Sequence, residues 1–373
     1  MRVRAIITFL AFFAISGHAL ADDVVDGRIG PGAFYRLVRP TNWNGSLVLY
    51  AHGTVSSDAP VGLPAEGDLI IGLLAPRGFA VAFSSFSDNG WAVKDGAQRT
   101  IQLLGIFTSK FGSPTRVYLA GTSLGGLIAI KLAETHPGQF AGALPACAVA
   151  GGSQRQFDYL SHTRALFDFF YPGVLPGDAG DVQPDINIGQ AIIAPALAAI
   201  SANPTGAAAI GAISQTPVPF ATPGELVESI TTALGGHASI QNNLLSLTHG
   251  HPYFDNRQTQ YSGSLPPSLL QAINLGVQRF DGSPSAVEYM NHYYEPSGDL
   301  RIPMLMLSTS RDPVAPGFNQ TSYRDAVATA GNSDLLVQRE INRYGHCVFT
   351  PGELASAFTD LVLWVELGIK PAP

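Results

Sequence analysis

One stretch, residues 116–130, limits more than any other how this chain can fold. It contains an apolar run at 117–120, the pentapeptide Gly121–Gly125, and a helix-like segment at 124–135. This pattern predicts a strand, a sharp turn and a helix, with a single serine, Ser123, at the apex of the turn. Small residues on both sides of that serine let the backbone turn tightly and hold the side chain in a strained, exposed position.

Ser123 is therefore the candidate nucleophile. The pattern Gly-x-Ser-x-Gly also occurs by chance, in which case the serine would only cap the following helix. The strand and helix that flank it, and the partner residues identified below, favour the catalytic interpretation.

The first 21 residues have the pattern of a secretory signal peptide. Arg2 and Arg4 precede an apolar core at 5–16, and Ala19-Leu-Ala21 is typical of a cleavage site. The apolar core is too short for a membrane-spanning helix, and no later apolar run is long enough to cross a bilayer. We expect cleavage after Ala21 and a secreted or periplasmic protein.

The charge of the chain argues against nucleic acid and anionic membrane surfaces as partners. The formal net charge is −7, and loss of the two leader arginines would make it two units more negative. The sequence has no basic cluster that could contact phosphates. A small molecule or a polymer is the expected partner, and the oligomeric state stays open.

Strand-like and helix-like segments alternate over the first part of the chain, 22–150. Strands are expected at 33–38, 46–50, 78–83 and 140–147, and helices at 69–74 and 91–111, in addition to the strand and helix around Ser123. Such alternation predicts an α/β fold, with a mostly parallel sheet covered by helices on both faces.

Residues 151–300 break this alternation. They include alanine-rich helical segments at 188–213 and 223–235, with too little strand pattern to extend the sheet. We interpret them as a mainly helical cap over the C-terminal edge of the sheet, with a passive packing layer as the alternative. The sheet resumes in residues 301–373, with strands expected at 302–308 and 335–341 and helices at 318–330 and 351–367.

An activated serine needs a histidine to accept its proton and a carboxylate to orient that histidine. Reactive groups in open parallel sheets gather where the strands end. Asp312 follows the expected strand 302–308, and His346 follows the expected strand 335–341. We therefore predict Asp312 as the acid and His346 as the base.

Other acids and histidines fit these roles less well. Asp334 precedes its strand, at the wrong end of the sheet, and Asp255 and Asp281 fall in the cap segment. We expect His136 to end a helix as its C-terminal cap.

Two histidines of the cap segment, His249 and His251, have two open interpretations. They could line the cap side of a pocket, or they could be ordinary surface or packing histidines.

These motifs together resemble the α/β-hydrolase superfamily, in which the three groups occur in the chain order Ser, Asp, His. The resemblance covers 33–148 and 301–368. Its marks are the His52-Gly53 loop, the pentapeptide Gly121–Gly125, the Asp312–Pro316 turn and the Gly345-His346 loop. The resemblance implies the α/β-hydrolase fold. Within that superfamily the chain resembles secreted serine esterases and lipases, with prolyl-oligopeptidase-like hydrolases as the nearest neighbours.

An oxyanion hole needs two backbone N–H groups aimed at the substrate carbonyl oxygen. Leu124, the residue after the nucleophile, should supply one. By resemblance, Thr54 after His52-Gly53 supplies the other, while the role of His52 in such a loop is structural.

Cys147 and Cys347 are the two cysteines of the chain. Cys147 ends an expected strand and Cys347 adjoins His346, so both should lie at the catalytic edge of the sheet. In an exported protein, we predict a disulfide between them that anchors the His346 loop, with two separate buried thiols as the alternative.

The sequence predicts a serine hydrolase that cleaves carboxylic esters through an acyl-enzyme. It has no metal-binding, phosphate-loop or dinucleotide motif, so neither a cofactor nor a metal is expected. A serine at the elbow argues against a haloalkane dehalogenase or an epoxide hydrolase. A serine peptidase of the prolyl-oligopeptidase type and a non-catalytic binding protein on the same fold are the alternatives. A lipid, an aromatic acid ester and a polyester remain equally open as substrates.

Overall fold

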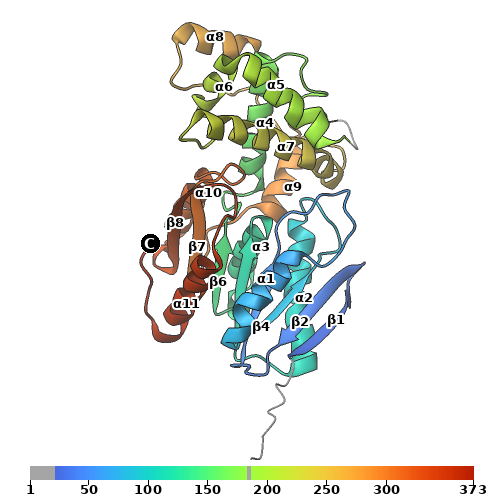
Figure 1. Cartoon of the computed structure of the whole chain (residues 1–373), viewed down its shortest axis with the longest axis vertical. Coiled ribbons are helices and arrows are strands. Elements are labelled where there is room, and N and C mark those ends of the chain that lie inside the picture. Colours follow the sequence, from blue (N-terminus) through green and yellow to red (C-terminus); the bar gives the residue numbers. More distant parts are fainter. Residues whose placement is uncertain (1–21, 183–185) are drawn as a thin grey trace, which may run out of the picture.

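The structure, a computed structural model, describes residues 22–182 and 186–373, so the expected signal peptide lies outside the described residues. Eight strands form one sheet in the order β1-β2-β4-β3-β5-β6-β7-β8. Helices cover both faces of this sheet, and a further group of helices lies beyond one of its edges (Figure 1).

The strand directions place the carboxyl ends of seven strands, all except β2, at one edge of the sheet. β1 pairs antiparallel with β2, β2 pairs antiparallel with β4, and every other neighbouring pair is parallel. The strands are β1 Asp23–Ile29, β2 Ala33–Arg39, β3 Ser46–Ala51, β4 Ala80–Ser84, β5 Arg116–Thr122, β6 Gly142–Ala146, β7 Met304–Arg311 and β8 Leu336–Tyr344. The loops after β3 to β8 therefore meet at that edge.

The central strands are buried on both sides, so their side chains are apolar on both faces of the sheet. In β3, Leu47 and Leu49 belong to one core, and Val48 and Tyr50 belong to the other. Helices α2 (Val93–Phe111) and α3 (Leu124–Thr135) pack on the first face. Helices α1 (Ala65–Leu74) and α11 (Pro351–Leu367) pack on the second, and α10 (Phe318–Thr329) contacts β8.

The segment between β6 and β7 consists of helices and loops. Its helices are α4 Ser153–Phe170, a π-helical turn at Gly189–Ile193, α5 Ala194–Ala202, α6 Pro204–Gly211, α7 Pro223–Leu247, α8 Pro267–Gly276 and α9 Pro284–Tyr294. Helices α4 and α7 pack closely against each other. They lie with α5, α6 and α8 on the same side of the sheet (Figure 1). The division of the chain into a core and a cap domain stays a prediction.

The predicted fold class is confirmed by the eight-stranded, mostly parallel sheet with its flanking helices. Several elements differ from the sequence prediction, which had no helix at the positions of α4, α8 and α9. The edge strand β1 was not predicted, α1 begins at Ala65 instead of residue 69, and α7 continues to Leu247 instead of ending at 235. The glycine pair Gly235-Gly236 lowers helix propensity, but buried residues such as Leu244 hold the helix together by packing.

None of the described helices, taken alone, has the length and apolar character needed to cross a membrane. One sharply bent pair, Gly189–Ala202 with Pro204–Gly211, meets that criterion by length and composition only when the two are counted together.

Candidate active site

Ser123 occupies a tight turn between β5 and α3. Its backbone has φ 55° and ψ −120°, a conformation that L-residues rarely adopt. A Cβ atom on Gly121 would lie 2.1 Å from the carbonyl oxygen of Gly125, and one on Gly125 would lie 2.0 Å from that of Ala51. Both glycines are therefore required by the close approach of the turn to its neighbours, as the elbow pattern predicts.

The structure brings Ser123, His346 and Asp312 into one hydrogen-bonded chain. His346 Nε2 lies 2.9 Å from Ser123 Oγ, and His346 Nδ1 lies 2.8 Å and 3.0 Å from the two carboxylate oxygens of Asp312. These contacts join side chains that are 223 and 34 residues apart in the sequence. The arrangement places a proton acceptor on the serine and a carboxylate on the far side of the imidazole ring.

Asp312 is buried, and its carboxylate is held by the loop that follows β7. Oδ1 accepts hydrogen bonds from the backbone N–H groups of Val314 and Ala315, at 2.8 Å and 2.9 Å. A buried carboxylate needs such partners to offset the loss of water. The loop therefore fixes the carboxylate in the orientation that meets His346.

The two residues predicted to form the oxyanion hole, Leu124 and Thr54, both lie near Ser123: Leu124 follows it in the chain, and Thr54 lines the same cavity as Ser123. Leu124 is the first residue of α3, so its N–H has no partner within the helix. Thr54 follows Gly53 in the loop after β3. In residues 22–182 and 186–373, neither N–H donates a hydrogen bond to a protein acceptor. Both amides are thus available to an oxygen atom bound near Ser123.

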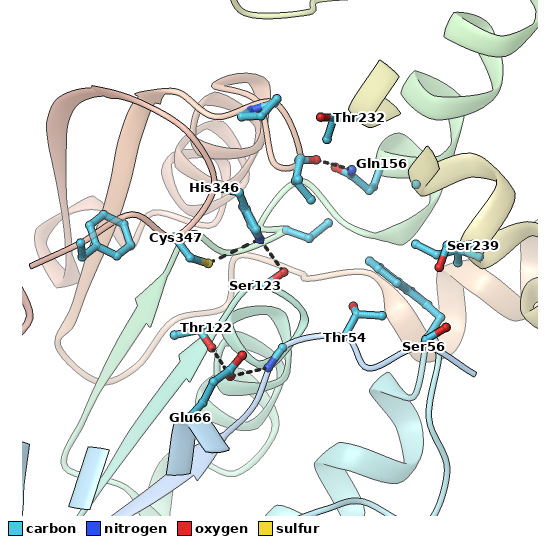
Figure 2. A pocket seen from close by; sticks show the side chains of 18 of the residues that line it. Thr54, Ser56, Glu66, Thr122, Ser123, Gln156, Thr232, Ser239, His346 and Cys347 are labelled. Atoms are coloured by element: carbon cyan, nitrogen blue, oxygen red, sulfur yellow. Dashed lines mark hydrogen bonds between the residues drawn. The ribbon is translucent and has the colours of Figure 1, made fainter. Parts of the chain in front are cut away.

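Ser123 and His346 open into a cavity of about 530 Å³, a volume that suits a small organic ligand. Figure 2 shows both side chains at its centre. Much of its wall is apolar, with residues such as Leu69, Trp91, Val149, Leu160, Ile240, Val314, Phe349 and Leu354. Gln156 of α4 and Thr232 and Ser239 of α7 add polar groups from the segment between β6 and β7.

The predicted disulfide between Cys147 and Cys347 is present, with their Cα atoms 5.2 Å apart. It links the end of β6 to the loop that carries His346. Cys347 Sγ lies 3.4 Å from His346 Nε2. Although the two cysteines and His346 lie close together, the bonded sulfur atoms offer no thiolate, which is the form that binds metals.

The positions of these groups along the sheet define the fold family. The serine follows the fifth strand at a strained turn, the acid follows the seventh, and the histidine follows the eighth. This strand order and the chain order of serine, acid and histidine are characteristic of one fold. The fold is that of the α/β hydrolases.

Solved structures with a similar backbone include esterases and a peptidase of this fold. An esterase from Aspergillus oryzae has 15% identity and a TM-score of 0.49, covering 93% of this chain and 80% of its own. A proline iminopeptidase from Mycobacterium smegmatis has 13% identity and a TM-score of 0.47, and the match covers 93% of this chain and 99% of that one. An esterase from Pyrococcus furiosus has 12% identity and a TM-score of 0.46, and the match covers 92% of this chain and 91% of that one. No protein-family model and no curated protein sequence matches the chain.

His52, in the loop after β3, has the structural surroundings expected of it. It is buried and stacks on Phe86, with ring centroids 3.9 Å apart. Its Nδ1 lies 2.7 Å from the carbonyl oxygen of Gly53. Burial lowers the pKa of His52, so the ring stays neutral at physiological pH.

The histidines that competed with His346 in the sequence do not line the cavity at Ser123. His136 is the C-terminal cap residue of α3, as predicted. His249 and His251 are exposed and do not line the cavity, which favours the surface interpretation.

The competing acids also have other surroundings. Asp334 lies in a short helical turn before β8, at the opposite end from His346. Asp255 and Asp281 form ion pairs with Arg257. None of the three acids contacts the imidazole of His346.

Two polar residues of the cavity, Glu66 and Gln156, were missed by the sequence reasoning. Glu66 lies in the first turn of α1, where acids commonly occur because they stabilise the helix dipole. Gln156 lies in the first turn of α4, in a stretch without a recognisable motif. No local pattern distinguishes either from an ordinary helix residue.

Proposed function

We propose that this protein is an exported serine hydrolase that cleaves carboxylic esters through an acyl-enzyme intermediate. The observation that carries the proposal is the continuous chain from Ser123 Oγ through the His346 imidazole to the Asp312 carboxylate, with contacts of 2.9 Å and 2.8 Å. Since this chain opens into a cavity of about 530 Å³, a substrate can reach the serine.

In the first half of the proposed reaction, Ser123 Oγ attacks the acyl carbon while His346 Nε2 accepts its proton. The negative charge that develops on the carbonyl oxygen is stabilised by the N–H groups of Leu124 and Thr54. Asp312 keeps the proton of Nδ1 in place and stabilises the imidazolium. When the tetrahedral intermediate collapses, His346 gives its proton to the leaving alcohol.

In the second half, water enters and His346 removes its proton, so that hydroxide attacks the acyl-enzyme. The second tetrahedral intermediate uses the same two N–H groups. Its collapse releases the carboxylic acid and returns the proton to Ser123 Oγ. The reaction consumes one ester and one water and produces one acid and one alcohol.

A serine peptidase is the second candidate, because the same groups cleave amides. One observation favours it: Glu66 places a carboxylate in the cavity that could bind the free amine of a peptide. Assays of aminoacyl anilides beside p-nitrophenyl esters of several chain lengths distinguish the two functions.

The test of the hydrolase proposal is Ser123→Ala. We expect ester hydrolysis to fall by several orders of magnitude and labelling by a fluorophosphonate probe to disappear. Ser56→Ala is the matched control, since Ser56 lines the same cavity but lies apart from His346. Undiminished turnover in Ser123→Ala would refute the proposal.

Export is supported by the leader pattern and by the Cys147–Cys347 disulfide, because disulfides persist in oxidising compartments. N-terminal sequencing of protein recovered from the medium or periplasm tests it, with Asp22 as the expected first residue. Recovery only in the cytoplasm, with the leader intact, would contradict export.

A further inference from the structure

We propose that Glu66 forms an anionic subsite beside Ser123, which selects esters that carry an ammonium group. This inference rests on the proposed hydrolysis and adds a substrate class to it. Glu66 lies in α1, outside the segment between β6 and β7, and its side chain lines the same cavity as Ser123 and His346.

One oxygen of the Glu66 carboxylate is fixed by three donors. Oε2 accepts hydrogen bonds from the Tyr50 hydroxyl at 2.9 Å, the Gly53 N–H at 3.3 Å and the Thr122 hydroxyl at 3.3 Å. Tyr50 is the next-to-last residue of β3, Gly53 precedes the proposed oxyanion residue Thr54, and Thr122 precedes Ser123. Figure 2 shows the bonds from Thr122 and the loop meeting at this carboxylate.

The other oxygen, Oε1, is left for a ligand. Within the described ranges, Oε1 has no hydrogen-bond donor from the protein. A Cβ atom built on Gly53 would lie 3.8 Å from Oε1 and 3.4 Å from the Cβ of Ser123. Oε1 therefore flanks the nucleophile, within reach of a group a few atoms from the scissile bond.

The negative charge of this network resides on Glu66. Burial, and then the neighbouring carboxylate, raise the pKa of Tyr50 well above its usual value. The phenol is therefore protonated at neutral pH, so that it donates to Glu66 while it also contacts the Thr122 hydroxyl at 2.8 Å. The group that the subsite presents to the cavity is therefore the carboxylate of Glu66.

No lysine or arginine lines the cavity, and Glu66 is its single carboxylate among the described residues. An anionic substrate would meet an uncompensated negative charge, whereas an ammonium group would be attracted to it. The aromatic rings of Trp91 and Phe349 also line the cavity, and aromatic faces attract ammonium groups. Because Glu66 is exposed to solvent, an ion pair there contributes at most about 1 kcal/mol, and we expect a preference of up to about fivefold.

The test compares a choline ester with its neutral isostere, in which carbon replaces the quaternary nitrogen. A second pair consists of two p-nitrophenyl esters, one with a quaternary ammonium group in its acyl part and one with carbon in place of that nitrogen. Wild type should prefer the cationic member of at least one pair by about threefold to fivefold in kcat/KM. Glu66→Gln keeps an acceptor for the three donors but removes the charge, and should bring that ratio to about one. Added salt should lower the wild-type ratio in the same direction.

Asp68→Asn is the matched control. Asp68 is an exposed acid on the same helix, paired with Arg36 and outside the cavity, so its removal should leave the ratio unchanged. Equal rates for cationic and neutral esters in wild type, or an unchanged ratio in Glu66→Gln, would overturn the subsite alone. Absence of all ester hydrolysis in wild type would overturn the proposed function and the subsite together.

Discussion

Gln156, in α4, donates a 2.6 Å hydrogen bond from Nε2 to the carbonyl oxygen of Val314. Val314 is two residues beyond Asp312, in the loop whose N–H groups bind the Asp312 carboxylate. The Tyr159 hydroxyl, one turn along the helix, donates to the carbonyl oxygen of Pro313 at 3.2 Å. Helix α4 thus lines the cavity and also holds the loop that positions the acid.

Gln156→Leu should lower kcat/KM for an ester by about tenfold, because it leaves the Val314 carbonyl without its partner and loosens the acid loop. Steady-state kinetics across pH provide the measurement, and the acidic limb of the profile should shift as Asp312 moves relative to His346. Gln154→Leu is the control, since Gln154 bonds Asp158 instead of the loop. An unchanged pH profile in Gln156→Leu would contradict a positioning role.

Asp312→Asn should reduce kcat by roughly three to four orders of magnitude, because an amide favours the wrong imidazole tautomer. The asparagine Oδ1 can still accept from Val314 and Ala315, so the melting temperature should change little. Asp334→Asn, in the turn before β8, should leave kcat unchanged. Comparable losses in both variants would argue against Asp312 as the acid.

The sequence predicted well those elements whose conformation is determined by neighbouring residues in the chain. The turn at Ser123 needs glycine at 121 and 125 because backbone atoms approach within about 2 Å of any Cβ there, and that requirement is visible in the pentapeptide. The edge strand β1 lacks such a signal. It is largely exposed and joined to β2 partly by surface ion pairs, such as Asp26 with Arg36, and therefore carries no run of apolar residues.

The residues around the triad were harder to predict for a related reason. Ser123, Asp312 and His346 each follow a strand, and the parallel sheet brings strand ends together. Glu66 and Gln156 act through tertiary contacts that depend on how α1 and α4 pack. A surface acid and a helix glutamine have the same local pattern whether or not they line a cavity.

Removal of the disulfide in Cys147→Ala/Cys347→Ala should lower the free energy of unfolding by roughly 2–5 kcal/mol. The bond closes a loop of 200 residues and anchors the segment that carries His346, so activity should also decline. Urea denaturation with and without a thiol reductant measures the effect. Reductant should destabilise wild type but not the double variant; equal stability of the two oxidised proteins would contradict the prediction.

Glu295 should make the stability of the fold depend on pH. Its carboxylate accepts the Gln154 N–H at 2.7 Å, near the start of α4, and burial raises the pKa of Glu295 to about 7. Lys131, which lowers this pKa, and Asp158, which raises it, also face the group. Because the folded state binds the proton more tightly than the unfolded state, the contribution to stability is complete below the ordinary glutamate pKa of 4.5 and is lost as pH rises through about 7.

Glu295→Gln, which stays neutral, should therefore flatten the fall in stability between pH 5 and 8, a difference of order 3 kcal/mol at most. Urea midpoints measured at several pH values provide the test. Glu288→Gln, an exposed change on α9, should keep the wild-type slope. Asp158, whose pKa burial raises to about 6, will leave some residual slope in the same direction. A Glu295→Gln variant with the full wild-type slope would place the titrating group elsewhere.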